Sequence, residues 1–126
     1  MHDSIGMPMA HKKFYLPYGA NDWRPSYADS TFTLVQNPNP VPVNINVKYL
    51  MPNGIDNVEF NDTLPANSRK TYTLGEKITY GFYDASTVVS STTPGQNIMV
   101  ECATYWSDGG SYYVGGTNTI GGYSDI

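Results

Sequence analysis

The sequence predicts an all-β, immunoglobulin-like β-sandwich of about seven to nine antiparallel strands in a single domain. Apolar and polar residues alternate with a period of two along most of the chain, which is typical of strands that bury one face. Turn-forming residues separate these stretches at intervals of roughly 8–15 positions. The 126 residues fit one domain, and a chain of this length can bury a core without disulfide staples.

In the first half of the chain, three segments alternate as strands do. They comprise residues 14–16, 31–36 and 43–49. In the second of these, the alternation predicts that Phe32 and Leu34 point inward. In the third, four residues are expected to point inward: Val43, Ile45, Val47 and Tyr49. Residues 37–42 hold three prolines at alternate positions, which cannot donate ladder hydrogen bonds, so a connecting loop is expected there.

The second half of the chain alternates turns and strands in the same way. Met-Pro-Asn-Gly at 51–54 predicts a tight turn, and residues 64–68 predict a second loop. Further strands are expected at 58–60, 69–74, 85–91 and 98–106. A terminal hairpin is expected over 111–120, with its turn at Gly115-Gly116. Residues 76–83 are ambiguous, and flanking glycines leave room for one helical turn at most.

Composition and charge restrict the class of protein. Charged residues make up only 14% of the chain and the formal net charge is −4, whereas tyrosine occurs 11 times. The few Lys and Arg residues are scattered, so no nucleic acid is expected as a partner. No apolar run reaches the ~20 residues that span a bilayer, so membrane insertion is not expected. Uncharged polar residues are typical of extracellular β-modules. Because Met1 begins no signal peptide, we expect a mature or excised piece.

No motif predicts catalysis or a bound cofactor. The sequence lacks a nucleophile elbow, a zinc-protease helix motif and a phosphate-binding loop. Two histidines and one cysteine do not predict a zinc site. Cys102 is expected to be a buried residue of a strand, with a crosslink between subunits as the alternative. We therefore expect no enzymatic activity, no metal and no cofactor.

The two ends of the chain resemble each other. Residues 2–6 read His-Asp-Ser-Ile-Gly, and residues 121–126 read Gly-Gly-Tyr-Ser-Asp-Ile. Such similarity is expected of one unit taken from a head-to-tail array, because the end of one repeat is then the start of the next.

Several short motifs follow in an order that resembles a known kind of domain. Their segments are residues 2–6, 14–19, 32–39, 47–54, 64–69, 86–91 and 100–106. Together they resemble an uncharacterised tandem β-repeat domain of bacterial and archaeal cell-surface proteins. Pro17 and Cys102 depart from its pattern, in which Glu and Arg are expected. The resemblance implies a location at the cell surface and use in an array, and it implies no catalytic residue.

The leading functional hypothesis is a non-catalytic structural unit of an extracellular surface assembly, either a tandem-repeat stalk or a filament joined head to tail. Residues 1–12 are expected to act as a linker or as an inter-subunit strand within the single domain 1–126. The expected partners are copies of the chain itself or neighbouring repeats. The residues expected to contact a neighbour are Ile5, Met7, Met9, Phe14, Leu16, Tyr123 and Ile126.

The alternative hypothesis is a carbohydrate-binding or adhesion module. Aromatic residues cluster in two places, around a loop near residue 25 and around an Asp/Gly loop near residue 109. Exposed rings at such loops could stack on sugars, although aromatic residues also fill cores and interfaces. The residues expected to contact a glycan are Trp23, Tyr27, Trp106, Tyr112 and Tyr113.

Overall fold

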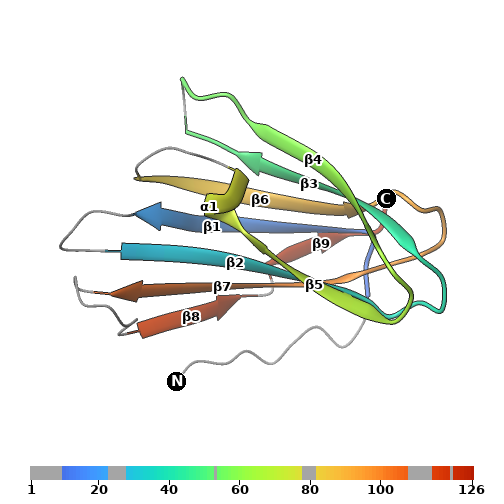
Figure 1. The fold of residues 1–126 in the computed structure, drawn as a ribbon. Helices are drawn as coiled ribbons and strands as arrows, with labels where there is room; N and C mark the ends of the chain where they lie inside the picture. The colour runs from blue at the N-terminus through green and yellow to red at the C-terminus, as the bar shows by residue number, and fades with distance from the viewer. Residues whose placement is uncertain (1–9, 23–27, 53, 78–81, 108–114, 120) are drawn as a thin grey trace.

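The computed structural model describes residues 10–22, 28–52, 54–77, 82–107, 115–119 and 121–126, which form nine strands and one short helix (Figure 1). In chain order these are β1 (Lys13–Asp22), β2 (Ala28–Asn37), β3 (Val43–Leu50), β4 (Val58–Leu64), β5 (Ser68–Thr73), α1 (Leu74–Lys77), β6 (Phe82–Ser91), β7 (Met99–Ser107), β8 (Gly115–Thr119) and β9 (Gly122–Ser124). The all-β fold that the sequence predicts is therefore confirmed. No helix in the described ranges has the length and apolarity to cross a membrane.

The strands form a sandwich of two antiparallel sheets that share a corner. Hydrogen bonding runs in the order β4-β3-β6-β1-β2-β7-β8, with β5 added to β2 and β9 added to β1. Between β1 and β2 the described register is a single pair, Asp22 with Asp29, whereas β1 pairs with β6 over most of its length. The two sheets are thus β4-β3-β6-β1-β9 and β5-β2-β7-β8.

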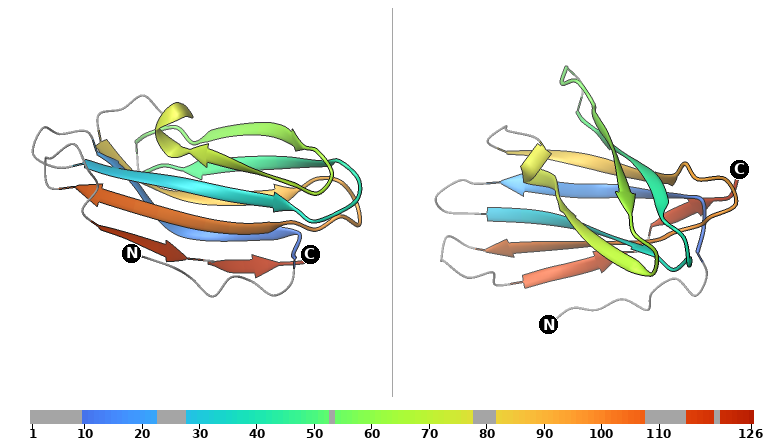
Figure 2. Two further views of the ribbon diagram at one scale, coloured as in Figure 1. Left: turned by 60° about the horizontal axis from the view of Figure 1, so that its bottom comes forward. Right: turned by 45° about the vertical axis from the view of Figure 1, so that its right-hand side comes forward.

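Consecutive strands close one side of the sandwich by passing from one sheet to the other. β4 belongs to the first sheet and β5 to the second, and Figure 2 shows the two strands along one side of the molecule. Asp62 of β4 accepts hydrogen bonds from Lys70 Nζ at 2.6 Å and from the Tyr72 hydroxyl at 2.8 Å. These contacts from β5 hold the pKa of the Asp62 carboxyl below its usual value, with the Lys70 bond as the largest cause.

The core is built from the alternating faces of the strands. The four residues expected to point inward from β3 are all fully buried, which confirms that part of the prediction. Phe14 and Leu16 from β1, Val35 from β2, and Val100 and Cys102 from β7 join them in one cluster. Strands of this alternation bury one face in the core and turn the other outward.

The prediction for β2 is wrong by one residue. Thr31, Thr33 and Val35 are buried, whereas Phe32 and Leu34 are only partly buried on the opposite face. A buried hydroxyl is tolerated when it is hydrogen-bonded, and the Thr31 Oγ1 atom lies 3.0 Å from the Thr104 Oγ1 atom. A one-residue slip turns every side chain to the other face, so the whole strand reverses relative to the prediction.

Asn37, the last residue of β2, fixes this register. Its side chain is fully buried, and its Nδ2 atom donates to the carbonyl oxygens of Val41, Leu64 and Pro65 at 2.9, 3.2 and 3.0 Å. Its Oδ1 atom accepts from the backbone and side-chain nitrogens of Asn39. The proline-rich segment is a connecting loop as expected, and Asn37 ties it to the β4–β5 turn.

Three further expectations meet different outcomes. A turn is present where Pro52 is found, because the Ile55 amide donates to the Pro52 carbonyl oxygen at 3.1 Å. Gly115 and Gly116, expected to form a turn, instead lie in β8 and pair with Trp106 and Tyr105 of β7. Helix α1 is a single turn as expected, but it begins at Leu74, before the ambiguous stretch.

Candidate functional site

The two ends of the described chain lie side by side at one end of the sandwich. β9 pairs with the beginning of β1 through the register pairs Lys13–Ser124, Phe14–Tyr123 and Tyr15–Gly122. Figures 1 and 2 show the start of β1 next to the C-terminal residue from several directions. A chain that enters and leaves a domain at one place brings its terminal segments within reach of a single neighbour.

His11 lies just before β1 and is held on two sides. Its backbone N–H donates to the Ile98 carbonyl oxygen at 2.9 Å, and the Ile98 N–H donates back to the His11 carbonyl at 2.9 Å. The imidazole is buried and stacks on Tyr123, with ring centroids 3.6 Å apart and an interplanar angle of 14°. The edge of Phe14 lies beneath it at 5.9 Å between centroids. Histidine and tyrosine thus join the first and last strands.

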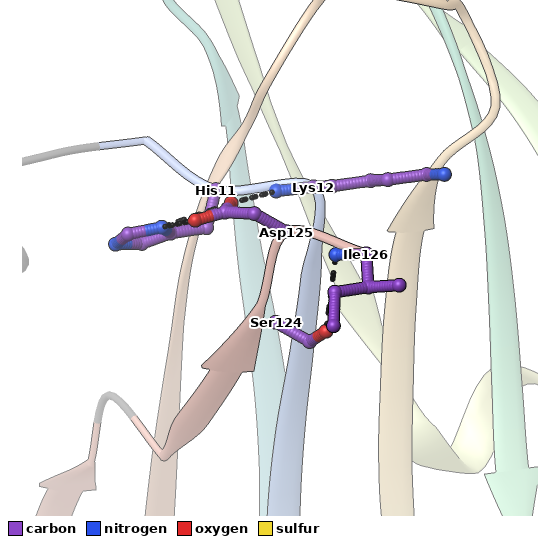
Figure 3. A network of polar contacts seen from close by, with 5 residues as sticks. All are labelled: His11, Lys12, Ser124, Asp125 and Ile126. Carbon is purple, nitrogen blue, oxygen red and sulfur yellow. Dashed lines mark hydrogen bonds and ion pairs between the residues drawn. The ribbon is translucent and has the colours of Figure 1, made fainter.

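Asp125 completes this junction, which we call the end clasp and define as His11, Lys12, Tyr123, Ser124 and Asp125. The carboxylate accepts from His11 Nδ1 at 3.0 Å and from the Lys12 backbone N–H at 3.2 Å, as Figure 3 shows. A tautomer with the proton on Nδ1 supplies the first donor. Because the His11 ring is buried and bonded, its contact with Asp125 holds the two chain ends together.

The contact with His11 is the main cause that lowers the pKa of Asp125 below its ordinary value of 3.8, and the Lys12 amide contributes further. A carboxyl whose pKa is lowered by folding stabilises the folded state above its ordinary pKa. That contribution is lost as the pH falls through the lowered value. The clasp is therefore intact at neutral pH and weakens only in strong acid.

Gly121 allows β9 to approach β1. Its φ angle is +61°, a conformation that residues with a side chain rarely adopt. A Cβ atom at this position would overlap the Tyr15 carbonyl oxygen and lie 2.9 Å from the Leu16 Cδ2 atom. At Gly122, by contrast, a Cβ atom would meet nothing within 4 Å. The close fit of β9 against β1 thus requires glycine at position 121 but not at position 122.

The residues expected to contact a neighbouring copy divide into three groups. Ile5, Met7 and Met9 lie outside the described residues. Phe14 and Leu16 are 0% and 1% exposed, so the expectation for their side chains is wrong: the alternation of β1 turns them into the core of their own chain. Tyr123 and Ile126 are 53% and 99% exposed, which leaves them accessible at the clasp.

Most of the expected glycan-binding residues are not among the described residues. Trp23, Tyr27, Tyr112 and Tyr113 lie outside the described residues. Trp106 is described only through its backbone, which pairs with Asp29 of β2 and with β8. The aromatic hypothesis therefore stays a prediction.

Neither His11 nor Asp125, which form the central contact of the end clasp, was predicted from the sequence as a site residue. His11 and Asp125 are 114 positions apart and belong to no motif that joins them. The only available signal was the resemblance between the two ends, which put an aspartate near each terminus. That signal indicated a repeat boundary, whereas the structure uses one of those aspartates to close the domain on itself.

Cys102 is confirmed as a buried residue of a strand, since only 2% of it is exposed. Burial raises the pKa of its thiol to about 11. Because the reactive species is the thiolate, we expect iodoacetamide at about pH 8 to leave the native protein unmodified. The same reagent should alkylate Cys102 fully in denaturant, as followed by intact mass. Rapid alkylation of the native protein would contradict this placement and revive the crosslink hypothesis.

Metal-ligating residues do not gather in the part of the chain that is described. There, no three side chains of His, Cys, Asp or Glu form a group that could hold a metal ion.

Comparison with known proteins defines the fold and leaves the family open. No family model matches the chain, and no curated protein matches its sequence. Solved structures do match. The crystal structure of Thermotoga maritima 1070 is similar with a TM-score of 0.74 and 14% identity, over 92% of this chain and 97% of that chain. The Anabaena sensory rhodopsin transducer is similar with a TM-score of 0.57 and 13% identity, over 75% and 96% of the two chains. At these identities the likeness shows a shared fold.

Proposed function

We propose that this chain is a non-catalytic structural unit of an extracellular surface assembly, and that copies of it join through their terminal segments. The end clasp is the observation that carries this proposal. It gathers the beginning of β1, the whole of β9 and the exposed Ile126 at one place on the surface. A neighbour that contacts this place contacts both ends of the chain at once.

Strand addition is the mode of joining that we infer. Among the described strands β9 pairs with β1 alone, so no other described strand occupies its second edge. An extended segment can add to such an edge, with backbone hydrogen bonds for affinity and side-chain pockets for specificity. The segment that we assign to this role is residues 1–9 of the neighbouring copy, which include the apolar Ile5, Met7 and Met9.

Three other features support a structural role. β-Sandwiches are common among cell-surface domains, and uncharged polar residues outnumber charged ones in this chain. The fold spans nearly all of both similar chains, so it occurs as a self-contained unit.

Negative-stain electron microscopy and sedimentation velocity over a wide concentration range test the proposal. We expect the full chain to form filaments or concentration-dependent oligomers. A variant that lacks residues 1–9 should stay monomeric and keep its cooperative unfolding, because the core of the described part of the chain is built without that segment. Assembly that is unchanged by the deletion would refute strand addition by this segment, and a full chain that is monomeric throughout would refute the proposal as a whole.

A further inference from the structure

A hollow lies against the end clasp and shares Lys12 and Asp125 with it. Its volume is about 730 Å³, and its lining includes residues of β1, β3, β4, β6, the β6–β7 loop and the C-terminal residues. It occupies the outer face of the sheet β4-β3-β6-β1-β9, at the end where β6 turns toward β7. The hollow is therefore part of a sheet surface and not a gap in the core.

One row of side chains forms the floor of this hollow. Lys13 pairs with Ser90, Ser90 with Asn46, and Asn46 with Asn61, so the four residues cross β1, β6, β3 and β4 in register. Residues directly opposite each other on neighbouring strands share one face of the sheet. With strands spaced about 4.8 Å apart, the row is roughly 14 Å long. We call these four residues the polar row.

The chemistry of the lining is mainly that of amides and hydroxyls. Beyond the polar row, the last residue of β6 and the β6–β7 loop add uncharged side chains, namely those of Ser91, Thr92, Thr93, Gln96 and Asn97. Such groups both donate and accept hydrogen bonds, as the hydroxyls of a sugar do. The charged residues in the lining are Lys12, Lys13 and Asp125, so charges of both signs are present.

Hydrogen bonds between side chains hold part of this surface in place. Asn46 Nδ2 donates to Asn61 Oδ1 at 3.0 Å, and Thr63 Oγ1 donates to Asn44 Oδ1 at 2.7 Å. A second hollow of about 540 Å³ lies over Asn44 and Thr63, and it shares Asn61 and Thr92 with the first. The two hollows thus form one continuous polar track. Polar groups that are already oriented lose less entropy when a ligand binds.

An exposed aromatic ring adjoins the polar row. Tyr15 lies two residues after Lys13 on the same face of β1, and its side chain is 44% exposed. Its register partner on β9 is Gly122, which has no side chain to cover the ring. The Lys13 ammonium is 5.9 Å from the centre of the Tyr15 ring, so the ring and the row are contiguous. Protein sites that combine an aromatic surface with fixed hydrogen-bonding groups match a sugar, which has an apolar ring face and polar edges.

We propose that this face binds a neutral oligosaccharide, with one sugar ring against Tyr15 and further hydroxyls along the polar row. A nucleic acid would need many more cations than Lys12 and Lys13. A protein partner would need buried apolar or Arg anchors, whereas the row offers amides and hydroxyls. The site differs from the aromatic loops that the sequence suggested. The polar row lies on the sheet face and not at the β9 edge, so ligand binding and assembly can be measured separately, and the hollow meets the clasp at Lys12, Asp125 and Ile126.

Titration of the ¹⁵N-labelled chain with defined probes tests this inference. The neutral probes are the tetrasaccharides of cellulose, chitin, mannan and starch, and the acidic probe is tetragalacturonate. We expect at least one neutral probe to cause saturable shifts in the side-chain amides of Asn46, Asn61 and Gln96. The substitutions Asn61→Ala and Tyr15→Ala should each weaken that binding about tenfold. Arg69→Ala, an exposed change on the opposite sheet, should leave it unchanged.

Several outcomes would overturn the inference. They are the absence of saturable shifts with every neutral probe, shifts confined to residues 105–113, tighter binding of the acidic probe, or equal weakening by Arg69→Ala. A thermal melt of each variant separates lost binding from lost folding. Because Asn61 and Tyr15 point to solvent, both variants are expected to melt as the unaltered chain does.

Discussion

Replacing Asn37 with leucine is expected to lower the free energy of unfolding by about 3–4 kcal/mol, a large effect for one polar residue. Leucine has the same number of side-chain heavy atoms but leaves the carbonyl oxygens of Val41, Leu64 and Pro65 without their shared donor. It also removes the acceptor of the Asn39 backbone N–H and one of the two acceptors of the Asn39 side-chain nitrogen, which keeps its bond to the Asn97 carbonyl oxygen. A buried polar group without a partner costs about 1–3 kcal/mol, so several together exceed what leucine gains by apolar burial. Urea unfolding monitored by circular dichroism measures the loss.

Two control variants separate the causes of this effect. Gln36→Ala changes the exposed residue next to Asn37 and is expected to stay within about 0.5 kcal/mol of the unaltered chain. Asn37→Asp keeps the shape but replaces the donor with a buried carboxylate facing carbonyl oxygens, so it should be at least as damaging as leucine at neutral pH. A stability of Asn37→Leu equal to that of Gln36→Ala would contradict the role of Asn37 as the tie between loops.

Replacing Gly121 with alanine is expected to detach β9 from β1. The added Cβ atom would overlap the Tyr15 carbonyl oxygen, and the φ angle of +61° adds a cost of about 1–2 kcal/mol. Because a three-residue strand can separate without unfolding the sandwich, the total loss of stability should be limited to about 2 kcal/mol. The clearest readout is the ring protons of His11 and Tyr123, whose stacking should produce shifts that vanish when β9 detaches.

Gly122→Ala is the matched control for this change. It adds the same methyl group one position later, where no atom lies within 4 Å. We expect its ring-proton shifts and its stability to match those of the unaltered chain. Retention of the His11 and Tyr123 shifts in Gly121→Ala would contradict the close fit described for β9.

The sequence predicts a strand well where one physical rule acts alone. β3 alternates strictly between apolar and polar residues, and all four of its predicted inward residues are buried. The prediction for β2 is wrong because two effects compete. The apolar Phe32 and Leu34 favour turning one face inward, but the hydrogen bonds of the buried Asn37 turn the other face inward. Those bonds join segments far apart in the sequence, so alternation within β2 could not reveal them.

The candidate site was less predictable than the fold. Glycines usually indicate a turn, yet Gly115 and Gly116 lie in β8, because pairing with β7 overrides local turn preference. The contact between His11 and Asp125 depends on the arrangement of the whole sandwich, which brings β9 beside β1. The polar row likewise arises from the register of four strands, and its members come from four separate stretches of sequence. Such sites follow from topology and not from local pattern.

The most direct test of the central claim compares the oligomeric state of three chains by sedimentation velocity at one high concentration. These are the unaltered chain, Gly121→Ala and Gly122→Ala. If copies join by adding a strand to β9, the unaltered chain and Gly122→Ala should assemble, whereas Gly121→Ala should sediment as a 13.9 kDa monomer. Equal assembly of all three chains, or its absence from all three, would contradict a joint built on the end clasp.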